Sequence, residues 1–301
     1  MEVLSVPTKS SLGNLLRATT ILPINDLKGV KCSTYAEGEQ QLRCKLAALY
    51  RVVDLCGWTH GIYNHISVRV DTSDQPQFLL NPFGLMYHEI TASSLVKVNL
   101  NGDIVDQGTS MFGVNKAGFT LHSAIHEARS DIKCVIHLHT PAATAVSAMK
   151  CGLLPLSQES MLLGNISYHE YHGIFVDEKE KEILAKNLGP TNKIIILHNH
   201  GVAVCGETIE EAFHLTFNFM AACEAQVRST SVGLKNIVLP SNDAQAQAYN
   251  VGNKGAVSID SSGFGWKCGE LEFEAIMRAM DSVGYRTGYD YKLLPIARQE
   301  K

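Results

Sequence analysis

The chain has 301 residues, of which 45% are hydrophobic and 19% charged, and this composition predicts a globular protein with one large domain. Its net charge of −4 and its scattered lysines and arginines argue against a surface for nucleic acid. No apolar stretch reaches the roughly 18 residues of a membrane span, and the eight cysteines form no CxxC pair. We therefore expect a cytoplasmic protein with reduced thiols, no transmembrane segment, no nucleotide cofactor and no nucleic-acid partner.

The first predicted helix follows residues 1–38, which have no hydrophobic period and are expected to form a partly ordered N-terminal arm. Leucines at three- and four-residue spacings predict a helix over 39–57. Alternating or continuous apolar residues then predict strands over 65–70 and 78–84. An Asn-Gly pair within 94–108 predicts a hairpin, because these residues tolerate the positive φ of a tight turn.

Helices and strands alternate through an expected head domain, residues 39–235, which is typical of a layered α/β fold. Short apolar runs at 133–138 and 193–199 predict buried strands. Residues 236–268 are rich in Gly, Ser, Asn and Ala without a period and predict a flexible linker. Residues 269–301 predict a C-terminal helix and extension. The helices predicted inside the head are 118–131, 142–150, 178–189 and 208–230.

Histidines stand at the ends of the two buried strands. His137 and His139 are two residues apart, so on a strand they share one face and can share one metal ion. His198 and His200 end the second strand, beside a glycine that allows a sharp turn. Three such ligands with an open fourth position would make a catalytic type of zinc site. The spacing alone leaves open a second interpretation, in which these are polar strand ends packed at a subunit contact.

Two other histidine pairs favour packing over metal binding. His122 and His126 stand four residues apart on a predicted helix, where they could share an ion but more often simply pack. His169 and His172, in "SYHEYHG", are expected in a loop with aromatic packing.

The motif HxH followed some 60 residues later by NHG resembles the class II aldolase family. In that family these histidines bind a divalent metal, usually zinc. By position the resemblance implies His137, His139 and His200 as the metal ligands and leaves His198 outside the motif.

Longer stretches, among them "YNHISVRV" and "KEKEILAKNLGPTNKIIILHNHGV", resemble the head domain of the adducin family, within the class II aldolase/adducin superfamily, almost word for word. The likeness covers residues 43–240 and 266–291. It implies a three-layer α/β/α sandwich, with a central, largely antiparallel sheet flanked by helices.

The resemblance to adducins also implies a cytoskeletal role. It implies a homo-oligomer, or a hetero-oligomer with other adducin chains, that associates with actin and spectrin on the cytoplasmic side of the plasma membrane. Adducins carry a neck and a lysine-rich tail beyond the head, and these 301 residues contain no polybasic stretch. We therefore expect the chain to oligomerise but to bind filaments weakly by itself.

Departures from the aldolase pattern fall on the expected catalytic positions. The acid/base glutamate of the family falls on Gly118, and glycine has no proton to exchange. The family's phosphate-binding serines fall on Lys116 and Ala117, and its Gly-Asn pair on Asn64 and His65, while Gly84 matches a phosphate-loop glycine. We therefore expect a non-catalytic protein with a vestigial phosphate pocket that could still hold zinc or another divalent metal.

Two alternatives remain open at this point. The first is a metal-dependent aldolase or epimerase that acts on a sugar phosphate with a relocated acid/base. The second is a small-molecule-binding pseudoenzyme, in which the pocket senses a ligand.

Overall fold

The computed structural model describes residues 21–30, 35–70, 75–170, 178–254 and 263–292. Its centre is an eight-stranded sheet with the strand order β4-β3-β2-β1-β5-β8-β7-β6. All neighbouring strands are antiparallel except β6 and β7. The strands are β1 (His65–Val70), β2 (Gln77–Leu80), β3 (Val96–Asn99), β4 (Ile104–Asp106), β5 (Cys134–Leu138), β6 (Ile166–His169), β7 (Ile194–Leu197) and β8 (Gly201–Gly206).

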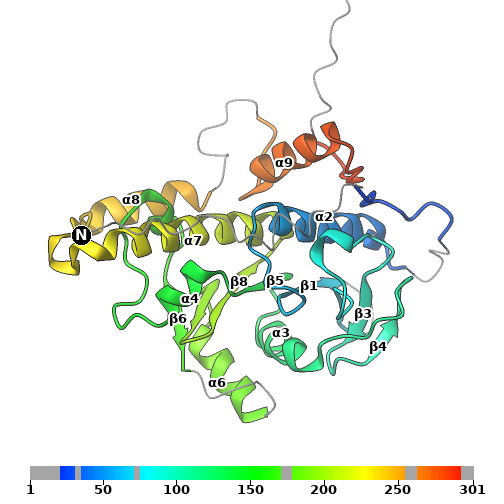
Figure 1. Cartoon of the computed structure of the whole chain (residues 1–301), viewed down its shortest axis with the longest axis horizontal. Helices are drawn as coiled ribbons and strands as arrows, with labels where there is room; N and C mark the ends of the chain where they lie inside the picture. The colour runs from blue at the N-terminus through cyan, green and yellow to red at the C-terminus, as the bar shows by residue number, and fades with distance from the viewer. Residues whose placement is uncertain (1–20, 31–34, 71–74, 171–177, 255–262, 293–301) are drawn as a thin grey trace, which may run out of the picture.

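Helices lie on both faces of this sheet, with α2 and α7 on one side and α3 and α6 on the other (Figure 1). The expected three-layer α/β/α sandwich with a largely antiparallel sheet is therefore confirmed. The helices are α2 (Glu39–Leu55), α3 (Lys116–Ala128), α4 (Pro141–Ser147), α5 (Gln158–Met161), α6 (Glu178–Leu188), α7 (Ile209–Ser229), α8 (Asn242–Gly252) and α9 (Glu270–Ser282). No helix in these described ranges combines the length and apolar character that a bilayer crossing requires.

Each buried strand divides its side chains between two cores, because successive side chains point to opposite faces. In β5, Ile136 packs into the core beneath α2 and α7, while Val135 packs into the core beneath α3 and α6. In β7, Ile194 and Ile195 divide in the same way. Burial on both faces explains why these strands appear in the sequence as continuous apolar runs.

The predicted hairpin is formed by β3 and β4, and Gly102 in its turn has a φ of 78°. Helix α7 is capped by Thr208, whose hydroxyl accepts a hydrogen bond from the Glu211 N–H at 3.0 Å. The Glu211 carboxylate does not bond back to the capping residue, as a capping box would require, but accepts from the Glu207 N–H at 2.7 Å.

The structure differs from the expected linker over 236–268. Helix α8 occupies part of this range, and the Ser241 hydroxyl caps it by accepting from the Ala244 N–H at 3.2 Å. None of its residues is buried, so the hydrophobic period that reveals most helices is missing from the sequence. Residues 255–262 of the same segment lie outside the described residues.

The two ends of the described chain pack together on the head. Ile24, which belongs to the segment expected to be partly ordered, is fully buried, and its N–H donates to the Tyr285 carbonyl at 2.8 Å. In α9, the Phe273 ring meets the Phe213 ring of α7 at 5.7 Å between centroids. Helix α9 therefore contributes to the same core as the head, rather than forming a separate unit.

Candidate metal centre

Three histidines converge where β5 and β8 meet. His137 lies in β5, on the face that carries Val135, and His139 follows just after the strand ends. His200 lies in the three-residue turn between β7 and β8. One ring nitrogen from each of these histidines lies within 4.8 Å of the other two.

The three imidazoles meet through their Nε2 atoms. The His139 Nε2 lies 2.6 Å from the His137 Nε2, and the His200 Nε2 lies 3.2 Å from the same atom. The His137 Nδ1 lies 3.0 Å from the Val202 carbonyl oxygen. A carbonyl only accepts, so Nδ1 carries the proton and Nε2 keeps its lone pair for a ligand.

The turn before β8 brings His200 to the other two histidines. Asn199 has a φ of 56°, a left-handed conformation in which asparagine is among the least strained residues. A side chain at Gly201 would begin 2.5 Å from the Leu138 carbonyl oxygen and 2.8 Å from the His139 ring, so glycine permits this close approach. His198 points elsewhere, with Nδ1 2.9 Å from the Ser147 carbonyl oxygen.

All three candidate ligands are held in the neutral form. Burial, followed by the neighbouring His200 and His60, lowers the pKa of His139 to about 4. Burial also lowers the pKa of His200, and, together with the surrounding histidines, the pKa of His137. Neutral imidazole is the form that binds a metal ion.

The donor set fits a divalent metal of the zinc type. At the usual Zn–N bond length of about 2.0–2.1 Å, two ligands of a tetrahedral ion stand about 3.3 Å apart. The separation of 3.2 Å between His200 and His137 already matches that value, and the 2.6 Å between His139 and His137 would have to widen. Three imidazoles leave one coordination position open.

Replacing His200 with alanine is expected to weaken Zn²⁺ binding by more than about 100-fold. Even losing the group behind a ligand typically costs about 10–100-fold in affinity, and here a ligand itself is lost. The matched control is His198→Ala, two residues away in the same turn, which should leave affinity within about threefold of the unchanged chain. Competition with a chromophoric chelator measures both; equal losses would refute the assignment.

The positions expected to form a phosphate pocket do not form a cationic cradle. Lys116 is 71% exposed at its side chain and lies 3.7 Å from the Asp103 carboxylate. Gly84 lies beneath the Phe112 ring, and Ala117 is half-buried in the first turn of α3. Asn64 is fully buried, and its Oδ1 accepts a hydrogen bond from the His60 N–H at 2.6 Å.

His65 and Gly118, by contrast, lie in direct contact. His65 pairs with His137 across β1 and β5, and their rings stack at 4.8 Å between centroids. A side chain at Gly118 would begin 2.4 Å from the His65 Nε2 and 2.6 Å from its Cδ2. The imidazole of His65 therefore fills the space that a side chain at Gly118 would need.

Sequence reasoning missed a polar chain behind His65. The His65 Nδ1 lies 2.6 Å from the His122 Nε2, and the Ser67 hydroxyl bridges His122 to His126. His122 and His126 are both buried, and each hydrogen-bonds to the Ser67 hydroxyl. The same-face spacings of His65 with Ser67 and of His122 with His126 were the available signal.

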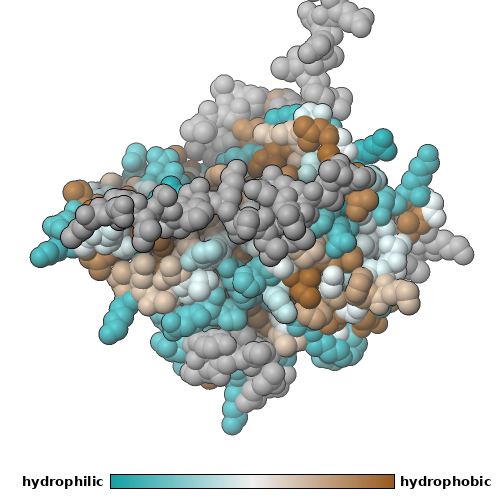
Figure 2. All heavy atoms as spheres, in the orientation of Figure 1, coloured by the Kyte–Doolittle hydropathy of each residue, from teal (hydrophilic) through white to brown (hydrophobic). Residues whose placement is uncertain are grey.

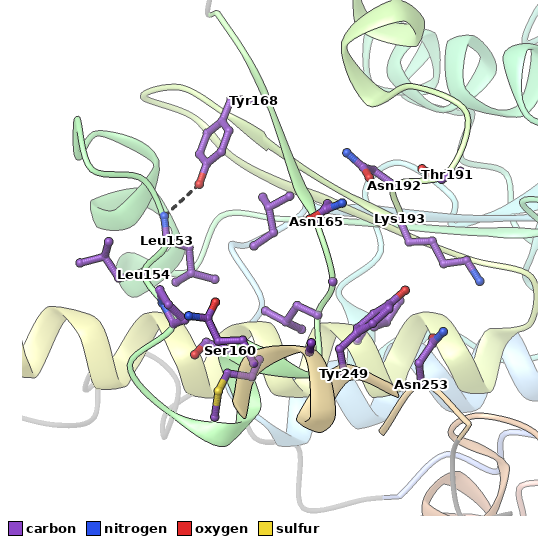
Figure 3. Close-up of a pocket in the computed structure, with 18 residues that line it drawn as sticks. Leu153, Leu154, Ser160, Asn165, Tyr168, Thr191, Asn192, Lys193, Tyr249 and Asn253 are labelled. Carbon is purple, nitrogen blue, oxygen red and sulfur yellow. Dashed lines mark hydrogen bonds between the residues drawn. The ribbon is translucent and has the colours of Figure 1, made fainter. Parts of the chain in front are cut away.

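A separate hollow of about 490 Å³ lies between α5, β6, α7 and α8 (Figure 3). Tyr249 of α8 and Asn253, which follows the helix, lie on one side of it, and Asn165 and Lys193 on the other (Figure 3). The Tyr168 hydroxyl accepts the Leu153 N–H at 3.0 Å at its edge. The sequence did not reveal this hollow because one of its walls is the unpredicted α8.

Comparison with known proteins supports the motif analysis. Residues 44–227 match the family described as Class II Aldolase and Adducin N-terminal domain. The chain is 53% identical to alpha-adducin of Rattus norvegicus over 287 residues, which is 93% of this chain and 38% of that protein. It is 48% identical to gamma-adducin of Homo sapiens over 284 residues, which is 93% of this chain and 40% of that protein. The chain therefore spans less than half the length of these relatives.

Among solved structures, an aldolase II superfamily protein from Pseudomonas syringae superposes with a TM-score of 0.76 at 38% identity. The match covers 86% of this chain and 100% of that one. The sandwich described above is therefore the class II aldolase fold.

Proposed function

The chain belongs to the class II aldolase and adducin N-terminal domain family, and from this premise we propose that it is a non-catalytic, adducin-like cytoskeletal protein that assembles through its head. In this proposal the oligomer is formed with further copies or with other adducin chains. It associates with actin and spectrin at the cytoplasmic side of the plasma membrane. The three-histidine centre is retained as a metal site, with zinc as the expected ion.

One observation carries the non-catalytic part of the proposal. The resemblance places the acid/base glutamate of the aldolases at Gly118, and the His65 imidazole lies 2.4 Å from where any side chain at that position would begin. General acid/base catalysis contributes about 10²–10⁴-fold to an enzymatic rate. A bound metal would still polarise a carbonyl, but we propose that no carboxylate is positioned to move the proton.

Turnover of a sugar phosphate tests this part against the enzymatic alternative. With Zn²⁺ and L-fuculose 1-phosphate, we expect no release of the aldehyde product above the level of a His137→Ala variant. Release by the unchanged chain that disappears in His137→Ala would identify a lyase with a relocated acid/base and would refute the proposal.

Exposed apolar side chains at the β4 edge of the sheet support assembly. Ile104 and Val105 in the edge strand β4 are 43% and 49% exposed, and the following loop carries Met111 at 99% and Phe112 at 48%. Figure 2 shows apolar side chains over the β3–β4 region of the molecule. Apolar groups gathered at a sheet edge are typical of surfaces that a partner covers.

Substituting Met111 with glutamate is expected to weaken self-association by about tenfold or more, which corresponds to about 1.4 kcal/mol. The side chain is almost fully exposed, so the fold should tolerate the charge, whereas a partner surface would have to desolvate it. The control is Val238→Glu, at an apolar residue that is 89% exposed elsewhere. Sedimentation equilibrium gives the dissociation constants. A monomeric unchanged chain would contradict assembly through the head.

Co-sedimentation tests the cytoskeletal part separately. The assembled chain is expected to pellet with F-actin and spectrin together, and less with either alone. Pelleting should fall in Met111→Glu if assembly multiplies weak contacts. If the chain does not pellet at any concentration, the proposed filament association is refuted, whereas the proposed assembly through the head is unaffected.

A further inference from the structure

A row of buried polar side chains connects the end of α3 to the edge of the metal centre. The His126 Nδ1 lies 3.3 Å from the Ile132 carbonyl oxygen, and the His126 Nε2 lies 2.8 Å from the Ser67 hydroxyl. The same hydroxyl lies 2.6 Å from the His122 Nδ1. The His122 Nε2 lies 2.6 Å from the Nδ1 of His65, which completes the row.

The direction of every hydrogen bond in this row follows from its first member. The Ile132 carbonyl only accepts, so the His126 Nδ1 carries a proton, and in a neutral ring the His126 Nε2 then accepts. Its donor is the Ser67 hydroxyl, which has one proton and must therefore accept from the His122 Nδ1. The His122 Nε2 accepts in turn, and its donor is the Nδ1 of His65.

Burial supports the neutral state on which this order depends. It lowers the pKa of His126 to about 3, with Arg69 and Lys133 lowering it further and the Ile132 hydrogen bond opposing them. It also lowers the pKa of His122 well below the ordinary value, helped by the neighbouring His126 and His137. Each ring then carries a single proton, and the row leaves one lone pair at its end.

That lone pair belongs to the His65 Nε2. The atom lies over Gly118, and the ring stacks on His137 at 4.8 Å between centroids. The His65 residue as a whole is 8% exposed. Within the described ranges no hydrogen-bond donor is assigned to this nitrogen.

We propose that the row from Ile132 through His126, Ser67 and His122 fixes His65 as the Nδ1–H tautomer, so that its Nε2 accepts a hydrogen bond from a hydroxyl-bearing neutral ligand beside the three-histidine centre. His65 is the binding residue here, and Ser67, His122 and His126 are positioning residues. The inference goes beyond the proposed cytoskeletal function and does not depend on it.

The charges around this position favour a hydroxyl over a phosphate. A lone pair on Nε2 attracts an O–H but repels an anionic oxygen. Lys116, the one cation among the expected phosphate positions, is exposed and lies beside the Asp103 carboxylate. A neutral polyol therefore meets a suitable acceptor, whereas a phosphate meets no compensating cation in this set of residues.

The tautomer is measurable on the full chain with ¹⁵N-labelled histidine, because protonated and unprotonated ring nitrogens have well-separated shifts. Signals of His65 are identified by their loss in His65→Asn. At neutral pH we expect an unprotonated Nε2 and a protonated Nδ1. A protonated Nε2 would overturn the proposal.

Two serine variants test whether the row sets this tautomer. Ser67→Ala removes the bridge, and we expect the His65 Nε2 to become partly protonated. The control is Ser123→Ala, which removes another buried hydroxyl of this region, one that donates to the Thr120 carbonyl at 3.0 Å. An unchanged His65 tautomer in Ser67→Ala, with the fold intact by its amide spectrum, would refute the positioning role.

Glycerol and glycerol 3-phosphate test the ligand class, because they share a skeleton and differ in the phosphate. We expect glycerol to shift the His65 Nε2 resonance in a saturable manner. Glycerol 3-phosphate should bind at least about threefold more weakly. Tighter binding of the phosphate, or no response to glycerol, would refute the proposed ligand class.

Discussion

Replacing Gly118 with alanine is expected to destabilise the fold by about 1–2 kcal/mol, although alanine is the better helix former. Alanine gains up to about 1 kcal/mol over glycine inside a helix. Against this gain, the new methyl group would lie 2.4 Å from the His65 Nε2, and overpacking of this kind costs about 1–3 kcal/mol. His65 cannot easily retreat, because its Nδ1 is bonded to His122 and its ring is buried. The cost of the clash should therefore exceed the gain in helix propensity.

A double-mutant cycle isolates that clash. In a His65→Ala background, Gly118→Ala should become neutral or stabilising, and the coupling between the two positions should reach about 1–3 kcal/mol. Gly113→Ala serves as the control, because a side chain there would meet nothing within 4 Å. Urea unfolding of the four chains gives the free energies. Additive effects would mean that His65 does not occupy the space over Gly118.

The contact between His65 and Gly118 could not be predicted from the sequence. The departures at His65 and Gly118 are visible in the sequence as separate changes. Their contact depends on the pairing of β1 with β5 and on α3 covering that part of the sheet. No local period in the sequence encodes either arrangement. The sequence alone therefore could not show that the His65 side chain occupies the space beside Gly118.

The three candidate ligands, by contrast, could be predicted because their signals are local in the sequence. His137 and His139 were expected to share a face because strand side chains alternate, and His200 stands between a continuous apolar run and a glycine. These signals are local, and the resemblance to the aldolases supplied the rest. In the structure the His198 Nδ1 faces the Ser147 carbonyl.

The elements that escaped prediction have weak local patterns. Helix α8 has no buried residue, so its sequence shows no apolar stripe. Strand β6 covers part of "SYHEYHG", which was expected to be a loop, and Tyr171 and His172 of that stretch lie outside the described residues. This strand pairs with β7 in parallel and also contacts α6, and both partners lie later in the chain.

Acidification from pH 7.5 to pH 5 is expected to cost the fold about 2 kcal/mol through His126 alone. The unfolded chain takes up a proton near the ordinary histidine pKa of about 6.5, whereas the folded chain resists it until the pKa of about 3. The stabilisation is therefore complete above pH 6.5 and is lost as the pH falls below that value. Between 6.5 and 5 the loss is about 1.4 kcal/mol for each pH unit.

The variant His126→Gln tests this figure, because glutamine can still bond to Ser67 but does not titrate. Its free energy of unfolding should fall about 2 kcal/mol less than that of the unchanged chain between pH 7.5 and pH 5. His88→Gln, a substitution outside the buried row, should follow the unchanged chain. Parallel curves for all three would show that His126 is protonated in the fold at pH 5. Burial against the Phe78 ring, at 4.7 Å between centroids, and the cations Arg69 and Lys133 all oppose that protonation.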